Sequence, residues 1–155
     1  MKQSFKLIKP LIRFSPKILT ALRLIRDTFL TFEEPKKTPL GFKLAGNSLM
    51  QAGVFESDET KIAKQILPNV DVFINIGANI GYYCCIARSI GIHSIAFEPI
   101  IQNVMHLLKN LKVNNYDRGT EVFPMALANK EGIVEIYGSG TGASIVKGWA
   151  GISHT

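Results

Sequence analysis

One segment of the sequence, residues 71–99, constrains the fold more than any other. It begins with a short apolar run, Val72–Ile76, continues through a turn that carries Gly77 and Gly81, and then reads as a helix. A second apolar run follows and ends on a carboxylate, Glu98. Strand, glycine turn, helix and strand in this order predict a βαβ unit, in which ligands bind at the carboxyl ends of the two parallel strands.

The glycine turn is suited to holding a nucleoside. Gly77 permits a sharp turn and a close approach to a ligand, and a helix that begins near Asn79 would point free N–H groups at the same place. Glu98 follows about 20 residues later, where an acidic residue can accept hydrogen bonds from ribose hydroxyls. Asn79 stands where a dinucleotide-binding loop has its middle glycine. This bulkier, polar loop favours S-adenosylmethionine, which carries no phosphate, over NAD.

Several runs along the chain then resemble one known family. Residues 73–83 read Phe-Ile-Asn-Ile-Gly-Ala-Asn-Ile-Gly-Tyr-Tyr, residues 96–99 read Ala-Phe-Glu-Pro, and residues 124–132 read Pro-Met-Ala-Leu-Ala-Asn-Lys-Glu-Gly. With matching runs at 38–44, 53–56 and 139–144, they resemble the FkbM-type family of S-adenosylmethionine-dependent methyltransferases, in order, over roughly residues 38–151.

The resemblance implies an α/β, Rossmann-like class I methyltransferase fold; the N-terminal helical extension before it is predicted from the pattern of residues 1–37. Glu98 would hold the ribose and Met125–Leu127 would border the adenine. The implied cofactor-binding residues are Asn75, Gly77, Ala78, Asn79, Gly81, Tyr82, Glu98, Met125, Ala126 and Leu127.

The chain departs from the family pattern in two ways. Asn75 replaces the aspartate that the family usually has at this position. The family also continues into a fourth strand, whereas this chain ends earlier. We therefore expect a partial methyltransferase domain at residues 38–155, truncated after the third parallel strand, with the first strand left as an open edge through which the chain self-associates.

Two functions remain open from the sequence. The first is S-adenosylmethionine-dependent methyl transfer, to an oxygen of a small-molecule or glycan acceptor, with weak or no activity for this chain alone. The second is a non-catalytic nucleoside-binding remnant or interaction module that needs a partner. No residue is assigned as catalytic base, and because His93, His106 and His154 do not cluster, we expect no metal site.

Basic residues are concentrated at the N-terminus. The net charge of +6 is carried by residues 1–40, and the remainder of the chain sums to zero. Basic residues interleaved with aromatics across the domain are absent, so we expect no nucleic-acid partner. Residues 1–37 read as a basic amphipathic helical extension and linker, with apolar helical spacing from Ile18 to Phe29. Two interpretations stay open: residues 1–30 lie on an anionic membrane surface, or the apolar stripe packs on the domain.

The remaining segments predict a simple order of elements. Short strands are expected within Phe42–Val54 with a turn at Gly46–Asn47, and a helix from an N-cap at Ser57 to Leu67. A later helix should bury Val104, Leu107, Leu108 and Leu111 and expose His106, and a third strand should span Glu121–Leu127 at the outer edge of the sheet. The adjacent Cys84 and Cys85 predict reduced thiols packed in the core of a cytoplasmic protein.

Overall fold

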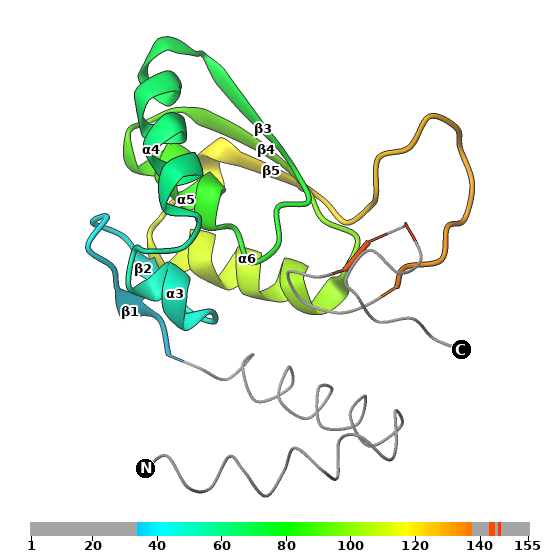
Figure 1. The fold of residues 1–155 in the computed structure, drawn as a ribbon, viewed down its shortest axis with the longest axis horizontal. Coiled ribbons are helices and arrows are strands. Elements are labelled where there is room, and N and C mark those ends of the chain that lie inside the picture. The colour runs from blue at the N-terminus through cyan, green and yellow to red at the C-terminus, as the bar shows by residue number, and fades with distance from the viewer. Residues whose placement is uncertain (1–33, 138–142, 145, 147–155) are drawn as a thin grey trace, which may run out of the picture.

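The computed structural model describes residues 34–137, 143, 144 and 146. Its centre is a parallel sheet of three strands in the order β3-β4-β5, formed by Val72–Ile76, His93–Phe97 and Thr120–Phe123 (Figure 1). The predicted α/β class with a parallel sheet is confirmed at this level, and β5 is the outer strand as expected. The amphipathic N-terminal segment and its two interpretations lie outside the described residues.

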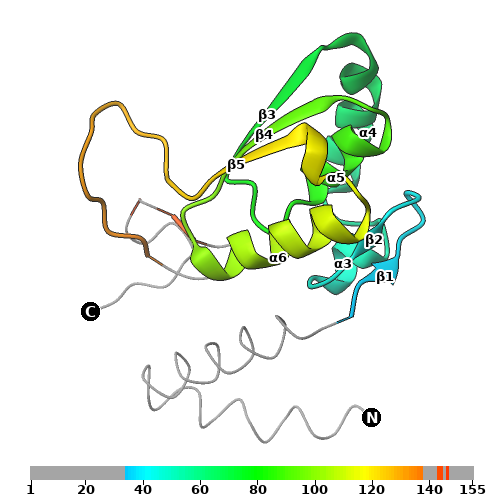
Figure 2. The same cartoon turned by 180° about the vertical axis from the view of Figure 1, so that it is seen from behind.

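Two helices connect the strands and cover one face of the sheet. Helix α5 (Tyr82–Ser89) joins β3 to β4, and α6 (Ile101–Val113) leads through the short helix η2 (Asp117–Gly119) to β5. Figure 2 shows both helices on the same side of the sheet. Ser94 and Ala96, which alternate along β4, are fully buried, as the period-2 side-chain alternation of a strand requires for the face that meets the helices.

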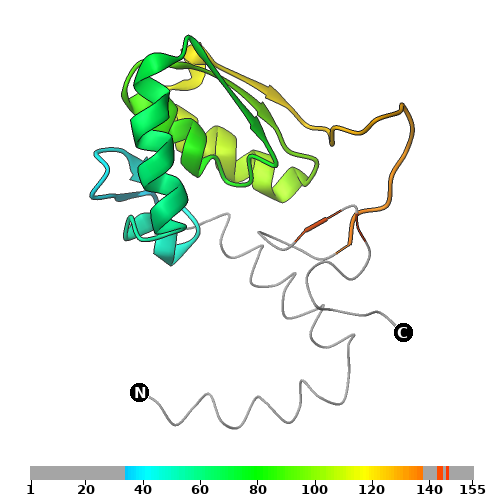
Figure 3. The same ribbon diagram turned by 45° about the horizontal axis from the view of Figure 1, so that its top comes forward.

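A smaller unit precedes the sheet. Strand β1 (Lys36–Lys37) pairs antiparallel with β2 (Lys43–Leu44), followed by α3 (Ser48–Gln51), α4 (Ser57–Ile66) and η1 (Leu67–Asn69). Helix α4 contacts α5 and leads to the start of β3 (Figure 3). The pair Lys36–Lys37 was expected in a linker, but backbone pairing with β2 places it in a hairpin.

Aromatic and aliphatic side chains hold the two units together. Tyr82, at the start of α5, is 2% exposed, and its ring makes edge-to-face contacts with Phe42, Phe55 and Tyr83 at centroid distances of 6.3, 5.6 and 5.3 Å. Such contacts add to the stabilisation from burial alone. The core therefore lies between α5, α6 and the N-terminal hairpin.

Two asparagines, Asn110 in α6 and Asn114 at its C-cap, join the N-terminal hairpin to this helix. Asn110 is fully buried; its Oδ1 accepts from Ala45 N at 2.7 Å, and its Nδ2 donates to Ala45 O at 3.2 Å and Ile80 O at 2.9 Å. Asn114, one turn later, bonds the N–H and C=O of Lys43 in the same way, both at 2.7 Å. Asn110 thus ties β2 and the glycine turn to one helix.

Four sequence predictions were wrong in detail. Part of Phe42–Val54 is helix, because Asn47 caps α3 by accepting from Leu49 N and Met50 N. The N-cap of α4 is Glu56, not Ser57. On α6, Leu108 is 49% exposed and His106 only 5%, because the buried face follows Asn103, His106 and Asn110. Strand β5 ends at Phe123, one residue before Pro124, which has no N–H to extend the ladder.

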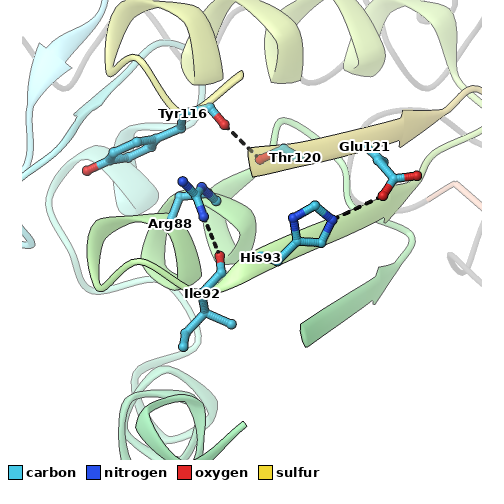
Figure 4. A network of polar contacts seen from close by, with 6 residues as sticks. All are labelled: Arg88, Ile92, His93, Tyr116, Thr120 and Glu121. Atoms are coloured by element: carbon cyan, nitrogen blue, oxygen red, sulfur yellow. Dashed lines mark hydrogen bonds and ion pairs between the residues drawn. The ribbon is translucent and has the colours of Figure 1, made fainter. Parts of the chain in front are cut away.

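A polar cluster fixes the amino ends of β4 and β5, away from the glycine turn (Figure 4). Arg88, in the last turn of α5, donates to Gly91 O at 3.2 Å and Ile92 O at 2.9 Å, so its positive charge lies at the helix C-terminus where the dipole favours it. His93 and Glu121 contact across the strands at 3.0 Å. These contacts join the end of α5 to the start of β4, and β4 to β5.

Candidate functional site

A pocket of about 220 Å³ lies at the carboxyl ends of the parallel strands. This is the location that a βαβ unit provides for ligands. The walls come from the ends of β3 and β4, the start of α6 and the segment after β5. The lining residues are Ile76, Gly77, Asn79, Phe97, Glu98, Pro99, Ile100, Met125, Ala126, Leu127, Ile136, Ala143 and Ser144.

Glu98 is the single charged residue among those lining residues. Its side chain is 4% exposed, and the protein itself supplies three donors. Asn79 N donates to Oε2 at 2.8 Å, while Ile100 N at 2.9 Å and Asn103 Nδ2 at 3.2 Å donate to Oε1. A carboxylate has about four acceptor positions, so about one, on Oε2, remains for a ligand.

The glycine turn, residues 77–81 (hereafter the site loop), has no free N–H group. Gly77 N and Ala78 N both donate to Phe97 O at 2.9 Å. Asn79 N donates to Glu98, Ile80 N to Asn79 Oδ1, and Gly81 N to Ala78 O. The expectation that a helix beginning near Asn79 would aim N–H groups at a ligand was wrong, because α5 begins only at Tyr82.

The site loop turns by means of three left-handed residues. Gly77, Asn79 and Gly81 have φ of 77°, 50° and 86°. Glycine adopts this conformation at no steric cost, and asparagine is among the few other residues that tolerate it. A Cβ on Gly81 would also lie 3.1 Å from Leu107 Cγ, whereas a Cβ on Gly77 would meet nothing within 4 Å. Gly81 therefore allows close helix packing, and Gly77 leaves the pocket side of the loop open.

The structure brings six of the ten residues expected at the cofactor into the pocket and leaves four outside it. Gly77, Asn79, Glu98, Met125, Ala126 and Leu127 line the pocket. Ala78, Gly81 and Tyr82 are absent from its lining; Ala78 and Tyr82 are buried in the core, and Gly81 packs against α6. Asn75 points to the helix side of the sheet, where its Nδ2 lies 3.4 Å from Cys84 Sγ.

Sequence reasoning missed several residues of the site. Ile76 and Ile100 adjoin predicted residues, so their place at the strand ends was accessible from the pattern. No local pattern placed Ile136 and Ser144 in the pocket, because the backbone bridge between Tyr137 and Ser144 positions them there. Asn103, which holds Glu98 from the first turn of α6, also lacked a signal in the sequence.

A second polar pair lies beside the start of α5. Tyr83 donates to Glu56 Oε2 at 2.9 Å. Burial raises the pKa of Tyr83 to about 12, helped by the neighbouring Glu56 carboxylate. Neither residue lines the pocket. At neutral pH the phenol is therefore protonated and serves as a hydrogen-bond donor.

The buried cysteines are poor nucleophiles. Cys84 and Cys85 are fully buried on α5, and burial raises the pKa of both thiols above its ordinary value. Within the part of the chain that the structure describes, no group of three or more His, Cys, Asp or Glu side chains is placed to hold a metal ion. No helix among the described residues has the length and apolar character needed to cross a membrane.

No protein-family model matches the chain, and no curated protein matches it.

Proposed function

We propose that the pocket binds the nucleoside part of S-adenosylmethionine, and that the chain is a Rossmann-like methyltransferase domain of the FkbM type. Its reaction would be transfer of a methyl group to an oxygen of a small-molecule or glycan acceptor. The observation that carries the proposal is the charge of the pocket: its described lining has one carboxylate, Glu98, and no Lys or Arg.

That charge discriminates between nucleoside ligands. Phosphates at this position of a βαβ unit are held by free N–H groups at the helix N-terminus and by basic side chains. Here every N–H of the site loop already has an acceptor within the protein. An acidic residue at the end of the second strand also occurs in NAD sites, where it holds the ribose, so the absence of basic side chains from the described lining and of free backbone N–H groups from the site loop makes the distinction. The pocket is therefore suited to a neutral or positively charged nucleoside and unsuited to ATP or NAD.

Glu98 has a defined part in this binding. Its remaining acceptor position on Oε2 would take one ribose hydroxyl without disturbing the protein. A second ribose hydroxyl would require one of the protein donors, such as Asn79 N at 2.8 Å, to move away. We therefore expect the site loop to shift when a nucleoside binds through both hydroxyls.

The volume of the pocket limits the size of the ligand that it can hold. A pocket of about 220 Å³ is smaller than the roughly 300–1,000 Å³ of common small-molecule sites. It suits a nucleoside better than a whole cofactor with its acceptor. The adenine would lie against the apolar wall formed by Met125, Ala126 and Leu127, which is the same segment that the resemblance assigns to it.

Methyl transfer from a sulfonium needs little acid–base catalysis from the protein. The sulfonium is already a strong electrophile, so aligning donor and acceptor supplies much of the rate. An acceptor hydroxyl needs a base to take its proton, and Glu98 is the one ionisable side chain in the described lining. Because Glu98 is held by three donors, this observation favours a second candidate function: a nucleoside-binding module that transfers no methyl group.

Isothermal titration of the full chain tests the proposal. We expect S-adenosylmethionine and S-adenosylhomocysteine to bind, and ATP and NAD to bind at least tenfold more weakly. Glu98→Gln should lower S-adenosylhomocysteine affinity about tenfold, since charge-assisted hydrogen bonds contribute about 1.5–3 kcal/mol. Glu121→Gln, which changes a 56% exposed carboxylate at the other end of the sheet, should leave the affinity unchanged.

Three outcomes separate the candidates. Release of S-adenosylhomocysteine from S-adenosylmethionine with a hydroxyl acceptor would support the methyltransferase, and binding without transfer would support the binding module. ATP binding as tight as S-adenosylhomocysteine binding would refute both, because it would contradict the charge argument. Thermal melts of Glu98→Gln distinguish loss of a ligand acceptor from collapse of the site loop that Glu98 holds.

A further inference from the structure

The site loop carries one amide side chain, that of Asn79, and this residue lines the pocket. Asn79 is half-buried and has a left-handed backbone with a φ of 50°. Its Oδ1 accepts a hydrogen bond from Ile80 N at 2.7 Å. Because a backbone N–H can only donate, this contact fixes which end of the amide faces Ile80. The Nδ2 group therefore points away from Ile80 N, and it has no hydrogen-bond partner among the described residues.

The contact with Ile80 explains the oxygen of the Asn79 amide but not its nitrogen. An aspartate would accept from Ile80 N equally well and also tolerates a left-handed backbone. Glycine would adopt the φ of 50° at no steric cost, and a dinucleotide-binding loop has glycine at this position. Neither alternative would supply a side-chain donor. Asparagine therefore adds to the site loop an uncharged group with two N–H donors.

Asn79 also lies beside the acceptor position that Glu98 keeps for a ligand. The backbone N of Asn79 donates to Glu98 Oε2 at 2.8 Å, and the remaining acceptor position of Glu98 is on this same oxygen. A ligand hydroxyl that donates to Oε2 would therefore be next to Asn79. A hydroxyl can donate one hydrogen bond and accept others, so a single hydroxyl can satisfy both side chains. A ketone oxygen or an ionised phosphate oxygen cannot, because it has no proton to donate to Glu98.

On the basis of the nucleoside site proposed above, we propose that Asn79 is a specificity-determining residue that recognises the ribose together with Glu98. One ribose hydroxyl donates to Glu98 Oε2 and accepts from Asn79 Nδ2. The pair selects a ribonucleoside over the deoxynucleoside that lacks this hydroxyl. Binding through this one hydroxyl leaves the bond between Asn79 N and Glu98 in place, so it requires no shift of the site loop.

NMR titrations of the isotopically labelled full chain with adenosine, 2′-deoxyadenosine and 3′-deoxyadenosine test this pairing. Asn79→Gly removes the amide and tolerates positive φ, whereas Asn79→Asp keeps an acceptor for Ile80 N and removes the donors. Both variants should bind adenosine about three- to tenfold more weakly, as expected for the loss of one hydrogen bond. The deoxynucleoside that lacks the shared hydroxyl should bind equally to the unaltered protein and to both variants. The side-chain amide signals that Asn79→Gly removes should shift when adenosine binds to the unaltered protein.

Asn115→Gly is the matched control for the loss of an asparagine at positive φ. Asn115 has a φ of 57°, is exposed and does not line the pocket, so its variant should bind all three nucleosides with unchanged affinity. Equal losses for all three nucleosides in the Asn79 variants would overturn the proposal, because Asn79 would then act through the shape of the loop.

Two other results would also overturn it. Adenosine binding that the Asn79 variants leave unchanged, or Asn79 amide signals that adenosine leaves unshifted, would refute the role of Asn79 and leave nucleoside binding through Glu98 intact. If none of the three nucleosides binds to the unaltered protein, both this role and the proposed function are refuted.

Discussion

Replacing Asn110 with alanine should destabilise the protein more than any other single truncation of a polar side chain in α6. Asn110 is fully buried and bonds three backbone groups, Ala45 N, Ala45 O and Ile80 O, at 2.7, 3.2 and 2.9 Å. The variant leaves a buried N–H without its acceptor and two carbonyls without a donor. Each buried group left unpaired costs about 1–3 kcal/mol, with carbonyls toward the lower end.

The expected loss is about 3–5 kcal/mol of unfolding free energy. The higher helix propensity of alanine offsets roughly 0.5 kcal/mol of it. Such a loss is large against the ~5–15 kcal/mol that stabilises a typical domain. Because Ile80 O belongs to the site loop, we also expect weaker nucleoside binding. Urea unfolding of the full chain, followed by circular dichroism at 222 nm, measures the stability change.

Asn114→Ala is the matched control. Asn114 also makes three backbone hydrogen bonds, to Lys43 N, Lys43 O and Asn110 O, all at 2.7 Å. Its bonds to Lys43 are exposed, so water can replace them, and we expect a loss of about 1 kcal/mol. If the two variants differ by less than about 1 kcal/mol, burial does not decide the strength of these hydrogen bonds and the reasoning fails.

Two further predictions concern the site loop and alkaline pH. Gly77→Ala and Gly81→Ala both place a Cβ at positive φ, which costs about 1 kcal/mol of stability. Gly81→Ala should lose more stability than Gly77→Ala, because its Cβ would lie 3.1 Å from Leu107. Equal melting temperatures of the two variants would contradict this. Since Gly77 lines the pocket and Gly81 does not, Gly77→Ala should reduce nucleoside affinity more than its stability loss explains. The raised pKa of Tyr83, about 12 against 10.0, means that the folded state holds this proton more tightly than the unfolded state. The stability that this proton contributes is present below pH 10 and is lost as pH rises from 10 toward 12. The melting temperature of Tyr83→Phe should therefore fall less steeply than that of the unaltered protein over this interval. An equally steep fall would refute the role of Tyr83 in the pH dependence.

Local patterns in the sequence determined the parallel βαβ core and three residues of the site, Gly77, Asn79 and Glu98. Alternating and continuous apolar runs fixed β3 and β4, Gly77 and Gly81 marked the turn, and Glu98 followed the second strand. These features are readable because strand period, positive φ and the end of a strand are properties of adjacent residues. Glu98 therefore lines the pocket, as its position after the second strand predicts.

Tertiary contacts decided the rest of the site. Ala78 lies within the glycine turn and Tyr82 follows it in sequence, but both are buried in the core, because α5 begins late and packs against the N-terminal hairpin. The sequence could not show that Glu98 is held by Asn79 N and Asn103, or that Asn110 bonds Ala45 across 65 positions. Hydrogen bonds between distant residues depend on which helix face meets which strand. That choice is made by packing the whole core, and no local pattern contains it.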